Sequence, residues 1–244
     1  MRYIIKRVAA RFGLFDSLRA MEQYTNLLLG RIHDPDYLEI PRTIGTSAIA
    51  DIGANIGQSM ISLRSLFPDN TIHAYEPNPA CGKTLRQVAK KLGHGVSVFD
   101  YGISDASKSL EFYVPVLRSG IELLQEGSFD KGVFDQPITV ERIAQPFTLK
   151  TQQCVLRTLD EVGTRYALIK IDVQGLELQV LKGAKALLRR DRPFVMLERD
   201  LRSEPDIDIF MKQFAYTSRV LTNNTLYIPP SGSCTPLMES PLSE

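Results

Sequence analysis

The amino-acid sequence predicts an α/β fold built on a mostly parallel sheet with helices on both faces. Short apolar runs typical of buried strands alternate with segments of helical periodicity along most of the chain, and such alternation favours a parallel sheet with crossover helices. A glycine turn separates the first apolar run from the first helical segment. Near the carboxyl end, the strand-like runs 217–221 and 226–228 have no helix between them. We therefore expect an antiparallel pair at one edge of the sheet.

The central strand and its glycine turn occupy residues 48–57. The run from Ala48 to Ile52 is apolar except for Asp51, as in a strand covered on both faces. Gly53 and Gly57 follow, and glycine permits backbone angles and close approaches that a Cβ would obstruct. A helix is predicted from 58 to 67, and its unpaired N–H groups would face whatever binds above the strand. This layout is typical of a nucleotide or cofactor site at the carboxyl end of a parallel sheet.

The spacing of the turn indicates which cofactor it binds. A dinucleotide site would require G-x-G-x-x-G after the strand, whereas here Gly53-x-Asn55-x-Gly57 follows Asp51 without a third glycine at the required place. The stretch resembles the acid-x-G-x-G/N-x-G turn of S-adenosylmethionine-dependent methyltransferases. This resemblance implies that Asp51, Gly53, Asn55 and Gly57 form part of a cofactor site. The alternative is a glycine turn that serves packing alone.

The remaining elements follow in order along the chain. Strands are predicted at 71–75, 96–99, 110–114, 167–172 and 194–197, and helices at 80–92, 175–190 and 207–214. From 115 to 150, glycines, prolines and mixed charges give no clean period. Irregular loops over a rigid sheet commonly carry specificity, so we expect this segment to recognise the substrate. The aromatic candidates for lining its pocket are Tyr101, Tyr113, Phe129 and Phe134.

Three regions are predicted. Residues 1–44 form an amino-terminal helical extension and loop, 45–228 form the α/β domain, and 229–244, rich in proline and serine, form a disordered tail. Within 1–30, apolar residues recur at helical spacing with basic residues between them. Such a helix can lie on an anionic membrane surface, contact a second copy of the chain, or pack on its own domain.

Composition narrows the class of protein. The content of 43% hydrophobic and 23% charged residues is that of an ordinary soluble globular protein, and a net charge of +1 gives no reason to expect a nucleic-acid partner. Three scattered cysteines without a C-x-x-C pair fit a reducing compartment, and three histidines argue against a histidine-rich metal centre. No apolar run reaches the roughly eighteen residues of a spanning helix. We expect a cytoplasmic protein, with peripheral contact to the inner face of the membrane as an alternative for residues 1–30.

One further acid and one further loop are candidates for cofactor binding. Glu76 ends the second strand, 19 residues after Gly57, where an acid can accept hydrogen bonds from both ribose hydroxyls of an adenosine moiety. This suits S-adenosylmethionine and NAD alike, and the same acid could instead sit at a helix N-terminus. Beyond the third strand, the loop with Gly102, Ser104 and Asp105 places a carboxylate that could meet the adenine amino group or form only a turn.

Two acids at strand ends are the catalytic candidates. Asp172 is the last residue of the predicted strand 167–172, and Glu198 ends the next strand. Carboxylates at adjacent strand tips can position a cationic sulfonium, orient a hydroxyl nucleophile or bind a divalent metal such as Mg²⁺. The alternatives are a helix cap or an ion pair with Lys170 or Arg199. The three histidines are interpreted as structural, and His33 is placed before the domain.

Several blocks resemble the FkbM family of methyltransferases. They are 51–57, 102–105, 158–161, 168–177, 180–184 and 192–198. The resemblance covers roughly residues 45–200, and its most distinctive block, K-I-D-V-E-G-x-E in type, has Gln174 where the family usually shows glutamate. An acid that binds metal or acts as base in other members would therefore be missing or relocated here.

The resemblance implies a class I methyltransferase (Rossmann-like) fold, with a seven-stranded, mostly parallel sheet and helices on both faces. It implies methyl transfer from S-adenosylmethionine to oxygen, commonly a hydroxyl of a sugar, glycan or secondary metabolite. An alcohol is a poor nucleophile when protonated, so a base or metal is expected near it. Two alternatives stay open at this point, namely an NAD-dependent oxidoreductase and a catalytically silent cofactor-binding protein.

Overall fold

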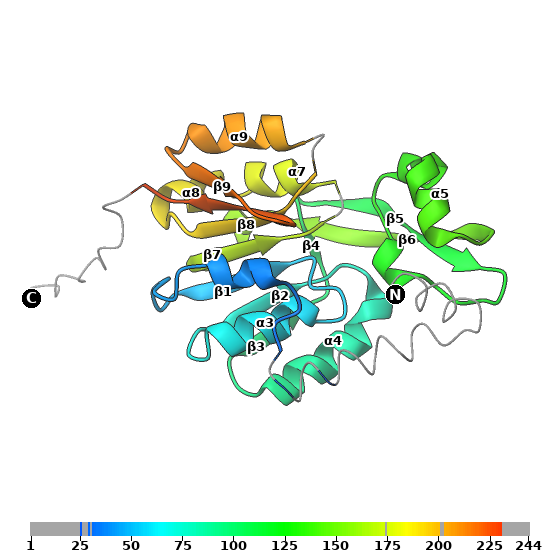
Figure 1. Cartoon of the computed structure of the whole chain (residues 1–244), viewed down its shortest axis with the longest axis horizontal. Helices are drawn as coiled ribbons and strands as arrows, with labels where there is room; N and C mark the ends of the chain where they lie inside the picture. Colours follow the sequence, from blue (N-terminus) through cyan, green and yellow to red (C-terminus); the bar gives the residue numbers. More distant parts are fainter. Residues whose placement is uncertain (1–24, 26–28, 30, 174, 201–202, 231–244) are drawn as a thin grey trace, which may run out of the picture.

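A seven-stranded sheet organises the computed structural model, which describes residues 25, 29, 31–173, 175–200 and 203–230 (Figure 1). Its strands are β1 (Ala48–Ile52), β2 (Ile72–Tyr75), β3 (Val96–Phe99), β7 (Tyr166–Ile171), β8 (Phe194–Glu198), β9 (Thr217–Val220) and β10 (Asn224–Ile228). The order is β3-β2-β1-β7-β8-β10-β9, parallel from β3 to β8 and antiparallel on both sides of β10. The predicted α/β class and the antiparallel edge pair are confirmed.

Helices cover both faces of this sheet (Figure 1). One face packs against α3 (Gln58–Leu66) and α4 (Pro79–Leu92), and the other against α7 (Glu177–Lys182), α8 (Lys185–Arg190) and α9 (Glu204–Lys212). Alternate residues of β1 serve the two apolar cores: Ile49 packs on the α3 side, while Ala50 and Ile52 pack on the α7–α9 side. Asp51 shares the face of Ile49, which directs its carboxylate toward α3.

The helix predicted as continuous over 175–190 is interrupted. The structure has two short helices, α7 and α8, with Gly183 and Ala184 between them. The break lies where other segments contact the backbone: the Gly183 carbonyl accepts from the Asp160 N–H at 3.0 Å, and a Cβ on Gly183 would overlap the carbonyl oxygen of Ser104. The backbone at Ser104 therefore packs directly on this glycine, and the apolar periodicity that both helices share does not reveal the break.

A second, three-stranded sheet stands at one end of the main sheet (Figure 1). It contains β4 (Gly102–Ile103), β5 (Lys108–Leu117) and β6 (Phe147–Arg157), with β5 and β6 antiparallel. The segments between them are η2 (Leu124–Glu126), η3 (Lys131–Asp135) and α5 (Pro137–Ile143), and α6 (Leu159–Val162) follows β6. The prediction that 115–150 has no regular structure is thus wrong in part. Threonine, lysine and glutamine on the exposed side of β6 obscure the two-residue alternation of apolar side chains that identifies a strand. In β5, Pro115 lies within the strand, where proline is unfavourable.

The segment before β1 packs on the α/β domain through an aspartate. Asp36, in the short helix η1 (Pro35–Glu39), accepts backbone hydrogen bonds from Thr222 at 3.3 Å, Asn223 at 2.7 Å and Asn224 at 2.9 Å. Although burial opposes ionisation, these donors hold the pKa of the Asp36 carboxyl below its usual value. The β9–β10 turn is thereby joined to residues that the sequence assigns to the amino-terminal extension.

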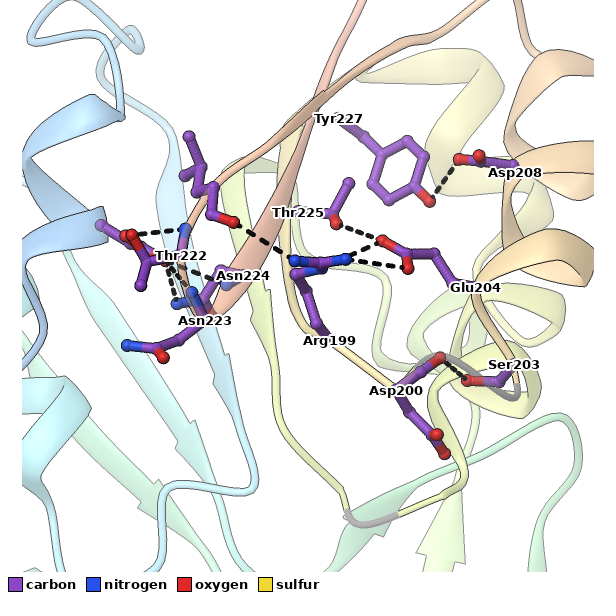
Figure 2. A network of polar contacts seen from close by, with 12 residues as sticks. Arg199, Asp200, Ser203, Glu204, Asp208, Thr222, Asn223, Asn224, Thr225 and Tyr227 are labelled. Carbon is purple, nitrogen blue, oxygen red and sulfur yellow. Dashed lines mark hydrogen bonds and ion pairs between the residues drawn. The ribbon is translucent and has the colours of Figure 1, made fainter.

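Figure 2 shows how this turn continues into a polar network. The guanidinium of Arg199 lies 3.3 Å from Glu204 of α9, and Glu204 also accepts from the Thr225 hydroxyl at 2.9 Å. On the next turn of α9, Asp208 accepts from the Tyr227 hydroxyl at 2.7 Å. These bonds fix α9 against β10 beside the carboxyl end of β8.

Most of the predicted amphipathic segment 1–30 and of the predicted tail lies outside the described residues. Across the described residues, every helix is too short or too polar to cross a membrane.

Replacing Asp36 tests its role as an anchor. Asp36→Ala should lower the free energy of unfolding by about 1–3 kcal/mol, because buried backbone donors lose their acceptor. The matched control is Glu39→Ala on the same helix, which removes an exposed ion pair with Arg219 and should cost less than about 1 kcal/mol. Urea denaturation measures both variants, and equal effects would contradict the anchoring role.

Candidate functional site

A cavity of about 210 Å³ opens at the carboxyl ends of β1, β2 and β7. Four of the predicted cofactor-binding and catalytic residues line it: Gly53, Asn55, Glu76 and Asp172. The start of α3 forms the adjoining wall. The position agrees with the general rule that ligands of parallel α/β sheets bind beyond the carboxyl ends of the strands.

The glycine turn brings backbone close to the neighbouring strand. Gly53 has φ +76°, and a Cβ there would overlap the carbonyl oxygen of Asp172. Gly57 has φ +99° and caps α3, where a Cβ would lie within 3.1–3.3 Å of Val88, Met60 and Leu85. Both glycines are therefore required by the conformation and by the close packing around the turn.

Glu76 connects the end of β2 to the glycine turn. Its Oε2 accepts a hydrogen bond from the backbone N–H of Asn55 at 2.8 Å, and Oε1 accepts one from Asn78 at 2.8 Å. Burial raises the pKa of Glu76 to about 7 despite these donors. A carboxylate has about four acceptor sites, so each oxygen retains capacity for a further donor from the cavity.

A buried lysine lies beneath the turn. Lys170 Nζ is 3.5 Å from Asp51 Oδ1 and 3.5 Å from Asp172 Oδ2, and it donates to the Gly53 carbonyl at 3.3 Å. Asp51, fully buried, also accepts from the Ser59 hydroxyl at 2.7 Å. Burial disfavours the ammonium, but Asp172 and Asp51 outweigh it and raise the pKa of Lys170. The ion pair that the sequence left open for Asp172 is thus present.

Asp172 and Glu198 form the predicted pair of acids at adjacent strand ends. Asp172 lines the cavity, whereas Glu198 is exposed beside it and within hydrogen-bonding reach of the Asp172 carboxyl. Partial desolvation and the neighbouring Asp172 charge raise the pKa of Glu198 to about 8. The pair can therefore share a proton near neutral pH.

Strand β4 and the residues that follow it lie outside the cavity lining. Gly102 packs behind Pro77 and against Leu156, and the Ser104 N–H donates to the Arg157 carbonyl at 2.8 Å. Asp105 forms an ion pair with Lys108 at 2.6 Å, which holds the pKa of Asp105 below its usual range. The structure does not bring Gly102, Ser104 or Asp105 to the cavity surface, so their cofactor contact stays a prediction.

The small sheet supplies an apolar wall to the cavity. Phe112 and Phe129 line it with ring centroids 4.8 Å apart in an edge-to-face arrangement, and Leu124 lies beside them. Of the aromatic residues predicted to line a pocket, Phe129 does so, while Tyr101, Tyr113 and Phe134 do not.

Hydrogen bonds attach this wall to the Glu76 loop. Gln152 of β6 donates to the Asn78 side chain at 2.8 Å, and the Cys154 thiol donates to the Pro77 carbonyl at 3.2 Å. Asn78 itself caps α4 through its side chain. The apolar wall is thereby held in register with the acid that ends β2.

His33 and Glu177 are residues of the site that were not identified from the sequence. His33 lines the cavity although its position before the domain had suggested a structural role. Glu177 accepts from the backbone N–H of Val173 at 3.3 Å and of Gly175 at 3.1 Å, which fixes the loop after Asp172. The sequence feature that could have identified Glu177 is the G-x-E spacing, which places this acid two residues after Gly175 beyond the strand. Gln174 lies outside the described residues.

No metal cluster accompanies these acids. In the part of the chain that the structure describes, no three His, Cys, Asp or Glu side chains are placed to hold a metal ion. The Mg²⁺ that the sequence left open therefore gains no support.

Comparison with known proteins gives a family match. The family model "Methyltransferase FkbM domain" matches residues 51–218. Methyltransferase 1 of Beauveria bassiana is 31% identical over 145 residues, which are 56% of this chain and 58% of that protein. The 31-O-demethyl-FK506 methyltransferase FkbM of Streptomyces tacrolimicus is 29% identical over 153 residues, 56% and 59% of the two chains. This chain therefore aligns with little more than half the length of these relatives.

Solved structures of similar architecture were also found. The crystal structure of Methyltransferase FkbM from Methylobacillus flagellatus KT has a TM-score of 0.49 at 18% identity, covering 75% of this chain and 43% of that one. That of a putative caffeoyl-CoA O-methyltransferase from Staphylococcus aureus has a TM-score of 0.47 at 14% identity, covering 88% and 92%.

The buried lysine can be tested by its removal. Lys170→Met should lower the free energy of unfolding by about 3–5 kcal/mol, because Asp51 would be left buried without its cation. The double variant Lys170→Met/Asp51→Asn should recover part of that loss, and Lys182→Met, at an exposed position on α7, serves as control. Thermal and urea unfolding report the effect. A Lys170→Met protein as stable as the original would contradict the ion-pair account.

Proposed function

The chain belongs to the FkbM methyltransferase family, and on that premise we propose that it transfers a methyl group from S-adenosylmethionine to a hydroxyl group. One observation carries the assignment of the cofactor to the cavity. The acid that ends β2 accepts a hydrogen bond from the glycine turn after β1, so Glu76 and Asn55 form one continuous surface. An adenosine moiety requires an acid and an open backbone turn side by side.

The residues of this surface fit the cofactor. Glu76 retains acceptor capacity for the two ribose hydroxyls, and the turn from Gly53 to Asn55 exposes backbone to the cavity. Asp51 and Gly57 support the turn from behind through Lys170, Ser59 and the start of α3. When bound, S-adenosylmethionine supplies a methyl group already activated as an electrophile by its sulfonium centre. The carboxylates of Asp172 and Glu76 favour a cation at this edge of the sheet.

The acceptor is proposed to be a hydroxylated small molecule or saccharide. Phe112 and Phe129 offer an apolar face to the cavity, and Asp172 offers a carboxylate to a hydroxyl. The name of the S. tacrolimicus relative, a 31-O-demethyl-FK506 methyltransferase, supports an oxygen acceptor on a small molecule. We propose that Asp172 orients this hydroxyl, with Glu198 modulating its charge, because in-line alignment is the main requirement of the reaction.

Two further expectations remain proposals. The buried free thiols Cys81 and Cys154 support a reducing compartment such as the cytoplasm. Residues 1–30 stay the candidate for a membrane-surface or homodimer contact, on the basis of their basic amphipathic sequence.

The cofactor is identified by calorimetric titration of the protein with S-adenosylhomocysteine, with NAD in parallel. We expect micromolar binding of S-adenosylhomocysteine and none of NAD. Binding of NAD alone would favour an oxidoreductase. With neither bound, the proposed function would be wrong.

Glu76 is expected to contribute to affinity directly. Glu76→Ala should weaken S-adenosylhomocysteine binding by roughly tenfold to a hundredfold, since hydrogen bonds to a charged group contribute about 1.5–3 kcal/mol. Glu198→Gln is the control, because Glu198 does not line the cavity and its loss should leave affinity unchanged. A folded Glu76→Ala protein with the original affinity would disprove the ribose assignment.

The raised pKa of Glu76 predicts a pH dependence of binding. The folded-state pKa is about 7, so Glu76 is mainly protonated at pH 6 and mainly ionised at pH 8. The ionised form is the stronger acceptor for ribose hydroxyls, and affinity should rise about tenfold over this range. Calorimetry at several pH values measures the change. The same rise in Glu76→Gln would show that another group is responsible.

A further inference from the structure

The segment before β1 crosses the edge of the cavity and is fixed at two distant points. At one point Asp36 is bound by the β9–β10 turn. At the other, the backbone N–H of His33 donates to the Ser62 hydroxyl of α3 at 3.0 Å. Tyr37, which follows Asp36, is buried and packs edge-to-face on the His33 ring, with centroids 5.0 Å apart. His33 lies outside the residues 51–218 that match the family model, yet this double attachment places its ring at the cavity.

The hydrogen bonds of Ser62 select one tautomer of His33. The Ser62 hydroxyl lies 2.9 Å from His33 Nδ1, accepts the His33 backbone N–H, and donates to the Gln58 carbonyl at 3.3 Å. A hydroxyl has one proton to donate and two lone pairs. All three contacts are satisfied only if the imidazole Nδ1 carries a proton and donates it to Ser62. His33 Nε2 is then left unprotonated, and it has no hydrogen-bond partner within the described part of the chain.

Charged groups of three elements face this ring. Lys170 of β7 opposes a positive charge on it, while Asp34 of the same segment, Asp51 of β1 and Asp172 after β7 favour one. Burial outweighs the carboxylates and, together with Lys170, lowers the pKa of His33 below its ordinary value. The imidazole is therefore neutral at physiological pH and able to take up a proton.

We propose that His33 is the general base of the methyl transfer and that Ser62 is the residue that positions it. This proposal rests on the proposed function. The acceptor O–H bond breaks and its proton passes to His33 Nε2, an O–CH₃ bond forms, and the C–S bond breaks to release S-adenosylhomocysteine. A base held in its tautomer by an adjacent group is a recurrent arrangement for activating a hydroxyl.

The two acids at the strand ends are less suited to this step. Asp172 is engaged both with the buried cation of Lys170 and with the Glu198 carboxyl, so its oxygens already have partners. Glu198 does not line the cavity. These acids orient and balance charge, while His33 offers a neutral nitrogen with a free lone pair.

Nitrogen NMR of the whole chain tests the tautomer directly. The sequence has only three histidines, so the single variants His33→Asn, His73→Asn and His94→Asn assign every imidazole signal. We expect His33 to be protonated at Nδ1 above pH 7 and to titrate below 6.5. S-adenosylhomocysteine should shift the His33 signals and leave those of His73 and His94 unchanged. An Nε2-protonated His33, or His33 signals that do not move while calorimetry shows the ligand bound, would overturn the proposal.

The positioning role of Ser62 has its own signature. Ser62→Ala should let the Nε2-protonated tautomer appear in the His33 spectrum, and Ser62→Thr, which retains the hydroxyl, should restore the original tautomer. Retention of the Nδ1-protonated form in Ser62→Ala would contradict the hydrogen-bond argument.

Kinetics separate His33 from the acids. With monosaccharides and polyols as acceptors and S-adenosylhomocysteine release as the signal, His33→Asn should lower kcat by about 10²–10⁴-fold with S-adenosylhomocysteine affinity unchanged. The limb of the pH–rate profile below 6.5 should disappear in the same variant. A kcat within threefold of the original, or a limb near pH 8 that is lost in Glu198→Gln instead, would assign the base elsewhere. Absence of S-adenosylhomocysteine binding to the original protein would refute the proposed function itself.

Discussion

The buried ammonium of Lys170 is the interaction on which the site depends. It joins the carboxyl ends of β1 and β7 by lying between Asp51 and Asp172, and it also holds the carbonyl of Gly53. Removing a charge from water is costly unless opposite charges and hydrogen bonds replace the solvent. Two carboxylates and a carbonyl provide that replacement here. The same contacts hold the glycine turn against the carboxyl ends of β1 and β7. The charge balance and the shape of the cavity therefore depend on the same residues.

The cavity is assembled from parts that are rigid for different reasons. The turn after β1 is fixed by close packing, because Gly53 leaves no room for a side chain. The end of β2 is fixed by the Glu76 carboxylate, which accepts from backbone on both sides. The small sheet is attached to the same loop through Gln152 and Cys154. The apolar wall and the polar surface formed by the glycine turn and Glu76 are thus positioned relative to each other by direct hydrogen bonds. This arrangement favours a preformed site.

The features that could be predicted from the sequence depend mainly on interactions between residues close together in the chain, and the missed ones depend mainly on distant partners. The strand, turn and helix from 48 to 66 are local, and their periodicity and glycines reveal them. The acids Glu76 and Asp172 were found because parallel strands bring their carboxyl ends to one edge. The break at Gly183 and the place of His33 were missed because each depends on a partner far along the chain: Ser104 for Gly183, and Ser62 for His33. The strand β6 was missed because its exposed, polar side obscures the alternation.

The charge balance at the strand ends also explains why a proton acceptor would come from another segment. Asp51 and Asp172 both lie 3.5 Å from the Lys170 ammonium, so their carboxylates are already engaged in balancing a buried cation. A group that must accept a proton near neutral pH needs a different environment, neutral and with a free lone pair. His33 has that environment because its ring is hydrogen-bonded to Ser62 and packs edge-to-face with Tyr37. Asp36 fixes the same segment to the β9–β10 turn, and Ser62 attaches it to α3, the helix that begins at the glycine turn. The position of His33 is therefore tied to the helix that also supports the cofactor surface.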